Sequence, residues 1–264
     1  MAEQSQPRDL SSLSAQFRSA IRGLTHQWGF AIVRTAYAND NDDAQWAAAL
    51  KKLHDYATPS DSGAEMDPDT FALPVISDSA FLRGADHASV RKAFKQWIAD
   101  FVGRERNKDD DDNEEWPSDV RRDVCIVIDE AALALLLSVP DFVRGKVPNL
   151  DLEPWVTVVD AEDPANIPYR GGGPYMGFTR AYVRVLSQLF DDLDSQSLEK
   201  LSPIRVYDGQ IPLFTGSSHG KLVDPPGGVE GRYKFPRGTP RGAQGVQAML
   251  EEIERAVGRG IMGS

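Results

Sequence analysis

Arg34 is the residue of this sequence best suited to hold a charged group. It follows residues 30–33, a run of β-forming residues that predicts a largely buried strand. A buried guanidinium needs a carboxylate or several other acceptors, because an unpaired charge is costly in the interior. Asp78, Asp129 and Asp160 lie at the ends of predicted strands and could each supply that carboxylate. Arg34 is therefore either half of a structural salt bridge or an arginine that grips a ligand.

Asp129 and Glu130 are the second pair of candidate ligand-binding residues. They follow the apolar residues 125–128, an order similar to the strand that positions metal and water in P-loop ATPases. Those enzymes also need a G-x-x-x-x-G-K-[ST] loop for the phosphates, but Gly145-Lys146 is followed by Val147 and preceded by no suitable glycine. We expect Asp129 to cap a helix and Glu130 to interact favourably with its dipole.

Tyr169 and Arg170 stand beside the glycine-rich segment 171–173 and Pro174, ahead of a predicted helix. An anion could meet free backbone amides at such a helix start. However, no G-x-G-x-x-G pattern follows a strand here, and Pro174 removes one donor. The segment is therefore either a flexible loop with a proline near the helix start, or a small-anion site that uses Tyr169 and Arg170.

Other chemistries lack a partner residue. The four histidines are far apart, with no second metal ligand three or four residues away, so no metal site and no cofactor are expected. Cys125 lies in an apolar run, where a thiol is usually an inert small hydrophobic group. No G-x-S-x-G motif occurs. The sequence identifies no catalytic residue, and whether the protein is an enzyme stays open.

Composition describes a soluble protein with a hydrophobic core. Of the 264 residues, 41% are hydrophobic, and the net charge of −11 makes nucleic acid an unlikely partner. A single cysteine excludes an intrachain disulfide. The first ten residues are polar, and the longest apolar stretch, 131–139, is too short to span a membrane. We expect a cytoplasmic or nuclear protein, without membrane contact, whose partner is an unknown protein or small molecule.

Hydrophobic periodicity predicts helices and strands that pack as an α+β fold, with helices on a mixed, mainly antiparallel sheet. Residues 1–12 form a polar tail, 13–215 a single domain, and 216–264 a loop-rich arm with a C-terminal helix. The predicted helices cover 13–28 (closed by Gly29), 46–56, 86–101, 130–137, 178–190 and 243–257. The predicted strands cover 30–37, 71–77, 124–128 and 155–159, with a hairpin formed by 204–207 and 211–214.

Three segments carry a resemblance to other proteins: Trp28-Gly29-Phe30 with Arg34-Thr35-Ala36-Tyr37 and Trp46, the segment 125–130, and the segment 155–160. In these segments the chain resembles a large group of uncharacterised proteins of filamentous (ascomycete) fungi. The resemblance covers roughly residues 28–160 and, more weakly, the segment that begins at Tyr175. The recurring residues are core positions and strand ends, so the resemblance implies a shared fold and assigns no activity to any residue.

Two functions are compatible with these observations. The first is a non-catalytic binding or interaction module, because the chain combines a good core with no reactive constellation. The alternative is an enzyme of fungal small-molecule metabolism that uses carboxylate acid–base chemistry around an arginine anchor. The direction of the Arg34 guanidinium, toward a cavity or toward a buried carboxylate, distinguishes the two.

Overall fold

The computed structural model describes residues 11–37, 42–58, 70–105, 116–143, 153–169, 172–217, 219–229 and 250–251. Contacts within the chain divide it into two compact units, Met1–Pro226 and Gly227–Ser264. The second unit contains only five described residues, so the predicted helix over 243–257 lies almost wholly outside the described part.

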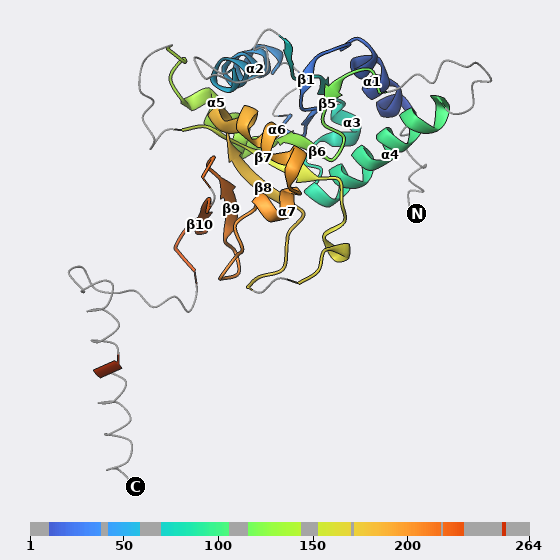
Figure 1. Cartoon of the computed structure of the whole chain (residues 1–264). Coiled ribbons are helices and arrows are strands. Elements are labelled where there is room, and N and C mark those ends of the chain that lie inside the picture. The colour runs from blue at the N-terminus through green and yellow to red at the C-terminus, as the bar shows by residue number, and fades with distance from the viewer. Residues whose placement is uncertain are drawn as a thin grey trace, which may run out of the picture. The chain divides into compact units, whose positions relative to one another are not determined.

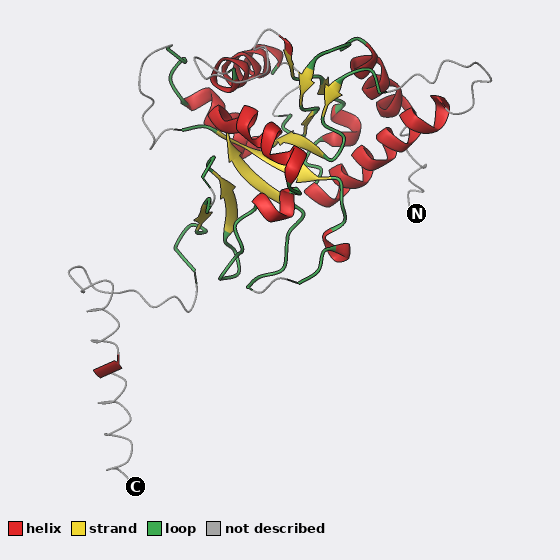
Figure 2. Ribbon diagram, viewed as in Figure 1, coloured by secondary structure: helices red, strands yellow, loops and turns green. Residues whose placement is uncertain are grey.

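A seven-stranded mixed sheet runs through the first unit (Figures 1 and 2), in the order β10-β9-β8-β7-β6-β2-β4. Its longest ladders, β6 with β7 and β7 with β8, are antiparallel, whereas β2 pairs in parallel with β4 and β6, and β8 with β9. The predicted α+β class with a mainly antiparallel sheet is confirmed. The strands are β2 (Ile32–Arg34), β4 (Val75–Ile76), β6 (Val124–Ile128), β7 (Trp155–Asp160), β8 (Phe178–Tyr182), β9 (Ile211–Phe214) and β10 (Lys221–Val223).

Helices cover both faces of this sheet (Figure 1). The core cluster under α2, α5 and α6 contains Val124, Ile126 and Ile128 of β6 and Val156 and Val158 of β7, whereas Cys125, Val127 and Val159 belong to the cluster under α1, α3 and α4. All five residues of β6 are buried, as expected for a strand covered on both sides. The helices are α1 (Ser11–Arg22), α2 (Asp43–Ala57), α3 (Ser79–Leu82), α4 (His87–Glu105), α5 (Glu130–Ser138), α6 (Leu186–Ser195) and α7 (Leu198–Leu201), with 3-10 turns η3 (Pro164–Asn166) and η4 (Val183–Val185).

The first predicted helix ends earlier than its sequence pattern indicates. It stops at Arg22, and Gly29 is part of a strand and not a helix cap. A second, parallel sheet joins β1 (Trp28–Gly29) to β3 (Phe71–Ala72) and β5 (Asp119–Val120). Gly29 has a φ of 142°, and a Cβ there would lie 2.0 Å from the Ala72 carbonyl oxygen. Glycine is needed here because two backbones approach closely.

The predicted helix over 178–190 is also wrong in its first part. Residues 178–182 form β8, whose burial alternates along the strand, and α6 begins only at Leu186. Phe178 and Tyr182 are spaced four apart, which fits a helix face as well as the alternation of a strand. The segment forms a strand because it pairs with β7 on one side and with β9 on the other. This pairing provides hydrogen bonds for the backbone groups of all three strands.

The predicted hairpin has one correct strand. Residues 211–214 form β9, but 204–207 are irregular, and the antiparallel partner of β9 is β10. Within the described residues, no helix is long and apolar enough to cross a membrane.

Candidate binding pocket

The Arg34 guanidinium points toward a buried carboxylate. Its partner is Asp42, just ahead of α2, and not one of the three aspartates expected at strand ends. Its Nε donates to the Ala36 carbonyl at 3.0 Å, and its planar group lies over the rings of Tyr37 and Trp46 at 4.4 and 4.6 Å. Arg34 is 5% exposed, so these protein groups occupy its donors and its faces. The structural salt bridge is the alternative that the structure supports.

Asp129 and Glu130 take the places expected of helix-capping residues. The Asp129 carboxylate accepts a hydrogen bond from the Ala132 N–H at 2.8 Å, which confirms it as the N-cap of α5. Glu130 is exposed in the first helical turn. The charge of Asp129 acts on His87 and Arg180, beneath the α4 side of the sheet. Arg34 contacts the α2 side, so the structure does not bring these candidates together in one site.

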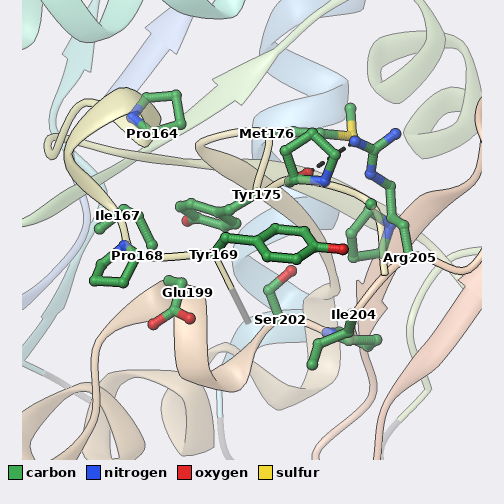
Figure 3. Close-up of a pocket in the computed structure, with 14 residues that line it drawn as sticks. Pro164, Ile167, Pro168, Tyr169, Tyr175, Met176, Glu199, Ser202, Ile204 and Arg205 are labelled. Carbon is green, nitrogen blue, oxygen red and sulfur yellow. Dashed lines mark hydrogen bonds between the residues drawn. The ribbon is translucent and has the colours of Figure 1, made fainter. Parts of the chain in front are cut away.

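Tyr169 lines a pocket of about 90 Å³, and its ring is 74% exposed. Arg170, its predicted companion, lies outside the described residues. One wall of the pocket comes from the loop between β7 and β8, and the other from α7 and the segment that leads to β9 (Figure 3). The lining is rich in proline and tyrosine: Pro164, Ile167, Pro168, Tyr169, Gly173, Pro174, Tyr175, Met176, Glu199, Ser202, Pro203, Ile204, Arg205 and Pro212.

The glycine-rich segment brings the two walls together. The Gly173 N–H donates to the Arg205 carbonyl at 2.7 Å, and Gly172 has a φ of +66°. A Cβ on Gly172 would lie 2.3 Å from the Arg205 oxygen, so only glycine permits this approach. The predicted helix start is wrong, because the strand β8 follows this segment, and the Gly173 amide is already bonded.

Two buried polar atoms beside this pocket have no hydrogen-bond partner among the described residues: the Ser202 hydroxyl oxygen and the Arg205 Nε. Ser202 is 7% exposed, and the Arg205 guanidinium is anchored by one bond, from Nη2 to the Pro174 carbonyl at 2.8 Å. A buried polar group without a partner costs free energy. Such groups beside a pocket point to a ligand that completes them.

The charged groups of the pocket lie on opposite sides of its aromatic centre. Figure 3 shows the rings of Tyr169 and Tyr175 between Glu199, on α7, and Arg205. The apolar side chains of Ile167, Ile204 and several prolines complete the lining. A ligand in this pocket would therefore meet a carboxylate, a guanidinium and apolar surface together.

A hydrogen-bonded pair behind the pocket fixes Tyr175. Its hydroxyl donates to the Asp160 carboxylate at 2.9 Å. Burial, followed by the charge and hydrogen bond of Asp160, raises the Tyr175 pKa far above its usual range. Burial also raises the pKa of Asp160. Tyr175 thus stays protonated and can orient a ligand, but it is unsuited to act as a base.

Buried Arg91, on α4, supports the same loop through its backbone. Its Nε donates to the Asp160 carbonyl at 2.9 Å, and one Nη donates to the Gly177 carbonyl at 2.9 Å. A Cβ on Gly177 would lie 1.9 Å from that Arg91 nitrogen. These bonds hold the start of β8, and hence the end of the pocket wall, against α4.

The single thiol of the chain, that of Cys125, is buried. Burial raises the pKa of the fully buried Cys125 thiol well above its usual range, so it is not a nucleophile. No cluster of three or more metal-ligating side chains occurs among the described residues. The arrangement around Tyr169 can bind and orient a small molecule.

A larger hollow of about 510 Å³ lies beside β5 and is lined in part by Trp116, Arg121 and Phe190. Arg121 is already paired there with Asp123, at 2.7 Å, and with Asp194. Because the main cation of this hollow is satisfied by the protein, the smaller pocket is the better candidate site.

Sequence reasoning found one side of the pocket and missed the other. Tyr169 was a candidate, whereas Ser202 and Arg205 fall where the sequence predicts a loop and a hairpin strand. No local pattern marks them, because they meet Tyr169 only through the tertiary fold.

Comparison of the chain with protein-family models, with curated proteins and with solved structures finds no match. The resemblance to proteins of filamentous fungi therefore stays a prediction, and the pocket itself is the basis for a function.

Proposed function

We propose that this protein is a non-catalytic binding module whose pocket beside Tyr169 holds a small zwitterionic ligand with an apolar side chain, such as an amino acid presents. The observation that carries the proposal is the pair of buried polar atoms without partners, Ser202 Oγ and Arg205 Nε, at the wall of one pocket. From the composition we further propose that the module works in the cytoplasm.

Charge complementarity selects the ligand class. The Arg205 Nε–H and the Ser202 hydroxyl can both donate to a carboxylate, and hydrogen bonds to charged groups are the stronger kind. Glu199, across the pocket, can attract an ammonium group. The tyrosine and proline side chains suit an apolar group beside the two charges. The ring of Tyr169, which is mostly exposed, can contact the part of this group that extends beyond the pocket.

The alternative, an enzyme with Arg34 as its substrate anchor, is not supported by the contacts of Arg34. The guanidinium that would anchor a substrate is held by Asp42 and by two aromatic rings.

Calorimetric titration with three matched probes tests the proposal. We expect L-phenylalanine to bind, and both 3-phenylpropionate, which lacks the ammonium group, and phenethylamine, which lacks the carboxylate, to bind more weakly. Arg205→Gln and Glu199→Gln should each lower the affinity for L-phenylalanine by about tenfold or more, the value of one charged hydrogen bond.

Lys200→Gln is the control, because Lys200 is exposed on α7 beside Glu199 but does not line the pocket. This variant should bind as the wild type does. If none of the probes binds, or if Arg205→Gln binds them all unchanged, the proposed ligand class is wrong.

A further inference from the structure

A second group of charged and aromatic side chains lies on neighbouring strands of the sheet, and none of them lines the pocket beside Tyr169. Arg180 on β8 pairs with Leu213 on β9, and Leu213 pairs with Lys221 on β10. Directly paired residues point to the same face, so Arg180 and Lys221 share it with one strand between them. At the usual spacing of strands, their Cα atoms are about 10 Å apart.

Each of these cations lies close to an aromatic ring. The Arg180 guanidinium carbon is 3.6 Å from the centre of the Trp155 ring, and the Lys221 Nζ is 5.7 Å from the centre of the Tyr182 ring. Trp155 and Tyr182 are themselves cross-strand partners of β7 and β8. The four side chains therefore form one patch, here called the Arg180 patch.

Neither cation is held in an ion pair within the described residues, although the charge of Lys221 interacts with that of the buried Glu153, the ion-pair partner of Arg184. Among the residues that the structure describes, neither Arg180 nor Lys221 makes a side-chain hydrogen bond or an ion pair. Arg180 is half-buried, and burial lowers its pKa, an effect that the charge of Asp129 only partly offsets. Such a guanidinium has lost hydrating water and has gained no acceptor in return. An anion that binds to it therefore gains more binding free energy than it would at a fully solvated arginine.

The N-terminal end of α4 forms the border of the Arg180 patch. The His87 ring lies 4.2 Å from the ring of Phe178, which precedes Arg180 by two positions and shares its face. Trp155, Arg180 and Tyr182 are partly exposed and Lys221 is exposed, so a small ligand can reach them.

We propose that the Arg180 patch binds a phosphate group, either as free phosphate or as a small aromatic phosphate ester. The flat ring of Trp155 holds one face of the guanidinium, which leaves its N–H edge to donate to two oxygens of one oxyanion. Lys221 adds a second positive charge on the same face. The net charge of −11 favours a small ligand here over a nucleic acid, whose many phosphates the rest of the surface would repel.

Nuclear magnetic resonance of the full-length, ¹⁵N-labelled protein tests this proposal. The reporter is the indole N–H of Trp155, assigned by its loss in Trp155→Phe. We expect it to shift in a saturable manner with inorganic phosphate and not with sodium chloride at equal ionic strength. Tighter binding of phenyl phosphate would identify an aromatic ester as the ligand, and equal binding would identify free phosphate.

Arg180→Gln should weaken phosphate binding by at least about tenfold. Lys221→Gln should also weaken it, and because Lys221 is exposed this substitution should leave the fold intact. Arg122→Gln is the matched control, because Arg122 is an exposed arginine 5.5 Å from another tryptophan ring, that of Trp116, and should bind as the wild type does. Ser202→Ala should also leave phosphate binding unchanged, since the pocket beside Tyr169 is a separate site. Equal shifts with chloride, or unchanged affinity in both Arg180→Gln and Lys221→Gln, would overturn the proposal.

Discussion

Arg34 and Asp42 join the end of β2 to the start of α2. Both side chains are almost fully buried, and two aromatic rings cover the guanidinium. A buried ion pair adds little over a well-packed apolar pair, but the loss of one partner leaves a charge that the interior cannot solvate. The pair thus explains why a residue that looks suited to a ligand serves the fold.

Arg34→Gln should therefore lower the free energy of unfolding by about 3–5 kcal/mol, because Asp42 would stay buried without its cation. Urea denaturation at neutral pH measures this change as a lower midpoint with an unchanged slope. A loss below about 1 kcal/mol, the usual value of a surface ion pair, would show that Arg34 and Asp42 do not form a buried structural pair.

Ser202, unlike Arg34, lowers the stability of the ligand-free protein. Its hydroxyl oxygen is buried without a partner, so Ser202→Ala should raise the free energy of unfolding of the ligand-free protein by about 1 kcal/mol or more. The same substitution should weaken ligand binding. Thermal unfolding of the ligand-free variant provides the first test, and a lower stability than the wild type would mean that the hydroxyl already has a partner.

Two glycines at the ends of elements have roles that could not be predicted from the sequence. Gly29 looks like a helix cap in sequence, yet its role depends on Ala72, which lies more than forty residues away along the chain. Likewise Gly172 makes room for the Arg205 backbone. A local pattern shows that a glycine is needed, but only the tertiary fold shows which atom requires it.

Gly29→Ala and Gly84→Ala separate these two roles. Both residues have a positive φ, but a Cβ on Gly29 would collide with the Ala72 oxygen, whereas nothing lies within 4 Å of one on Gly84. We expect Gly84→Ala to cost about 1 kcal/mol of stability from the backbone conformation alone, and Gly29→Ala to cost clearly more. Equal losses in chemical denaturation would contradict the close approach of β1 and β3.

Elements with a long buried run were predictable, and elements defined by their partners were not. The buried strand β6, the helix α4 with Val90, Phe94 and Trp97 on one face, and the Asp129 cap all follow from local spacing. By contrast, β8 has the same spacing of aromatic residues as a helix, and β10 is a short, partly exposed strand with no hydrophobic pattern of its own.

At the scale of the whole molecule, the candidate site could be predicted only in part, because the tertiary fold brings its residues together. Tyr169 stood out because of its neighbours in sequence, but Ser202 and Arg205 reach the pocket from another segment. Arg180 stood out for no local reason. Its importance comes from the alignment of four strands, which places its guanidinium beside Trp155, and from burial that the charge of Asp129 offsets only in part.

Stability of the folded unit should depend on pH through His87. Burial, the largest influence, lowers its pKa in the folded state, while Asp129 raises it and Arg91 lowers it further. Because the unfolded chain binds a proton at this histidine near pH 6.5 and the folded chain binds it only at a lower pH, stability should fall as the pH drops below about 6.5. The same stability should be fully present above that pH.

Denaturation of the wild type and of His87→Gln at about pH 7.5 and about pH 5.5 measures this effect. The wild type should lose more stability between the two values than the variant does. His54→Gln, at an exposed histidine, is the control and should follow the wild type. Burial raises the pKa of Asp160, so this residue changes the stability in the opposite direction as the pH falls. Because Asp160 is present in both proteins, its effect cancels when the wild type and His87→Gln are compared.

The most direct test of the proposed binding function uses Met176, which lines the pocket and is one of only five methionines in the chain. In protein labelled with ¹³C at the methionine methyl groups, and assigned by Met176→Leu, the Met176 signal should shift in a saturable manner on addition of L-phenylalanine. Ser202→Ala and Arg205→Gln should need about tenfold more ligand for the same shift, and Lys200→Gln should not differ from the wild type. A Met176 signal that stays in place while L-phenylalanine binds, or a titration that is identical in all four proteins, would show that the pocket beside Tyr169 is not the binding site.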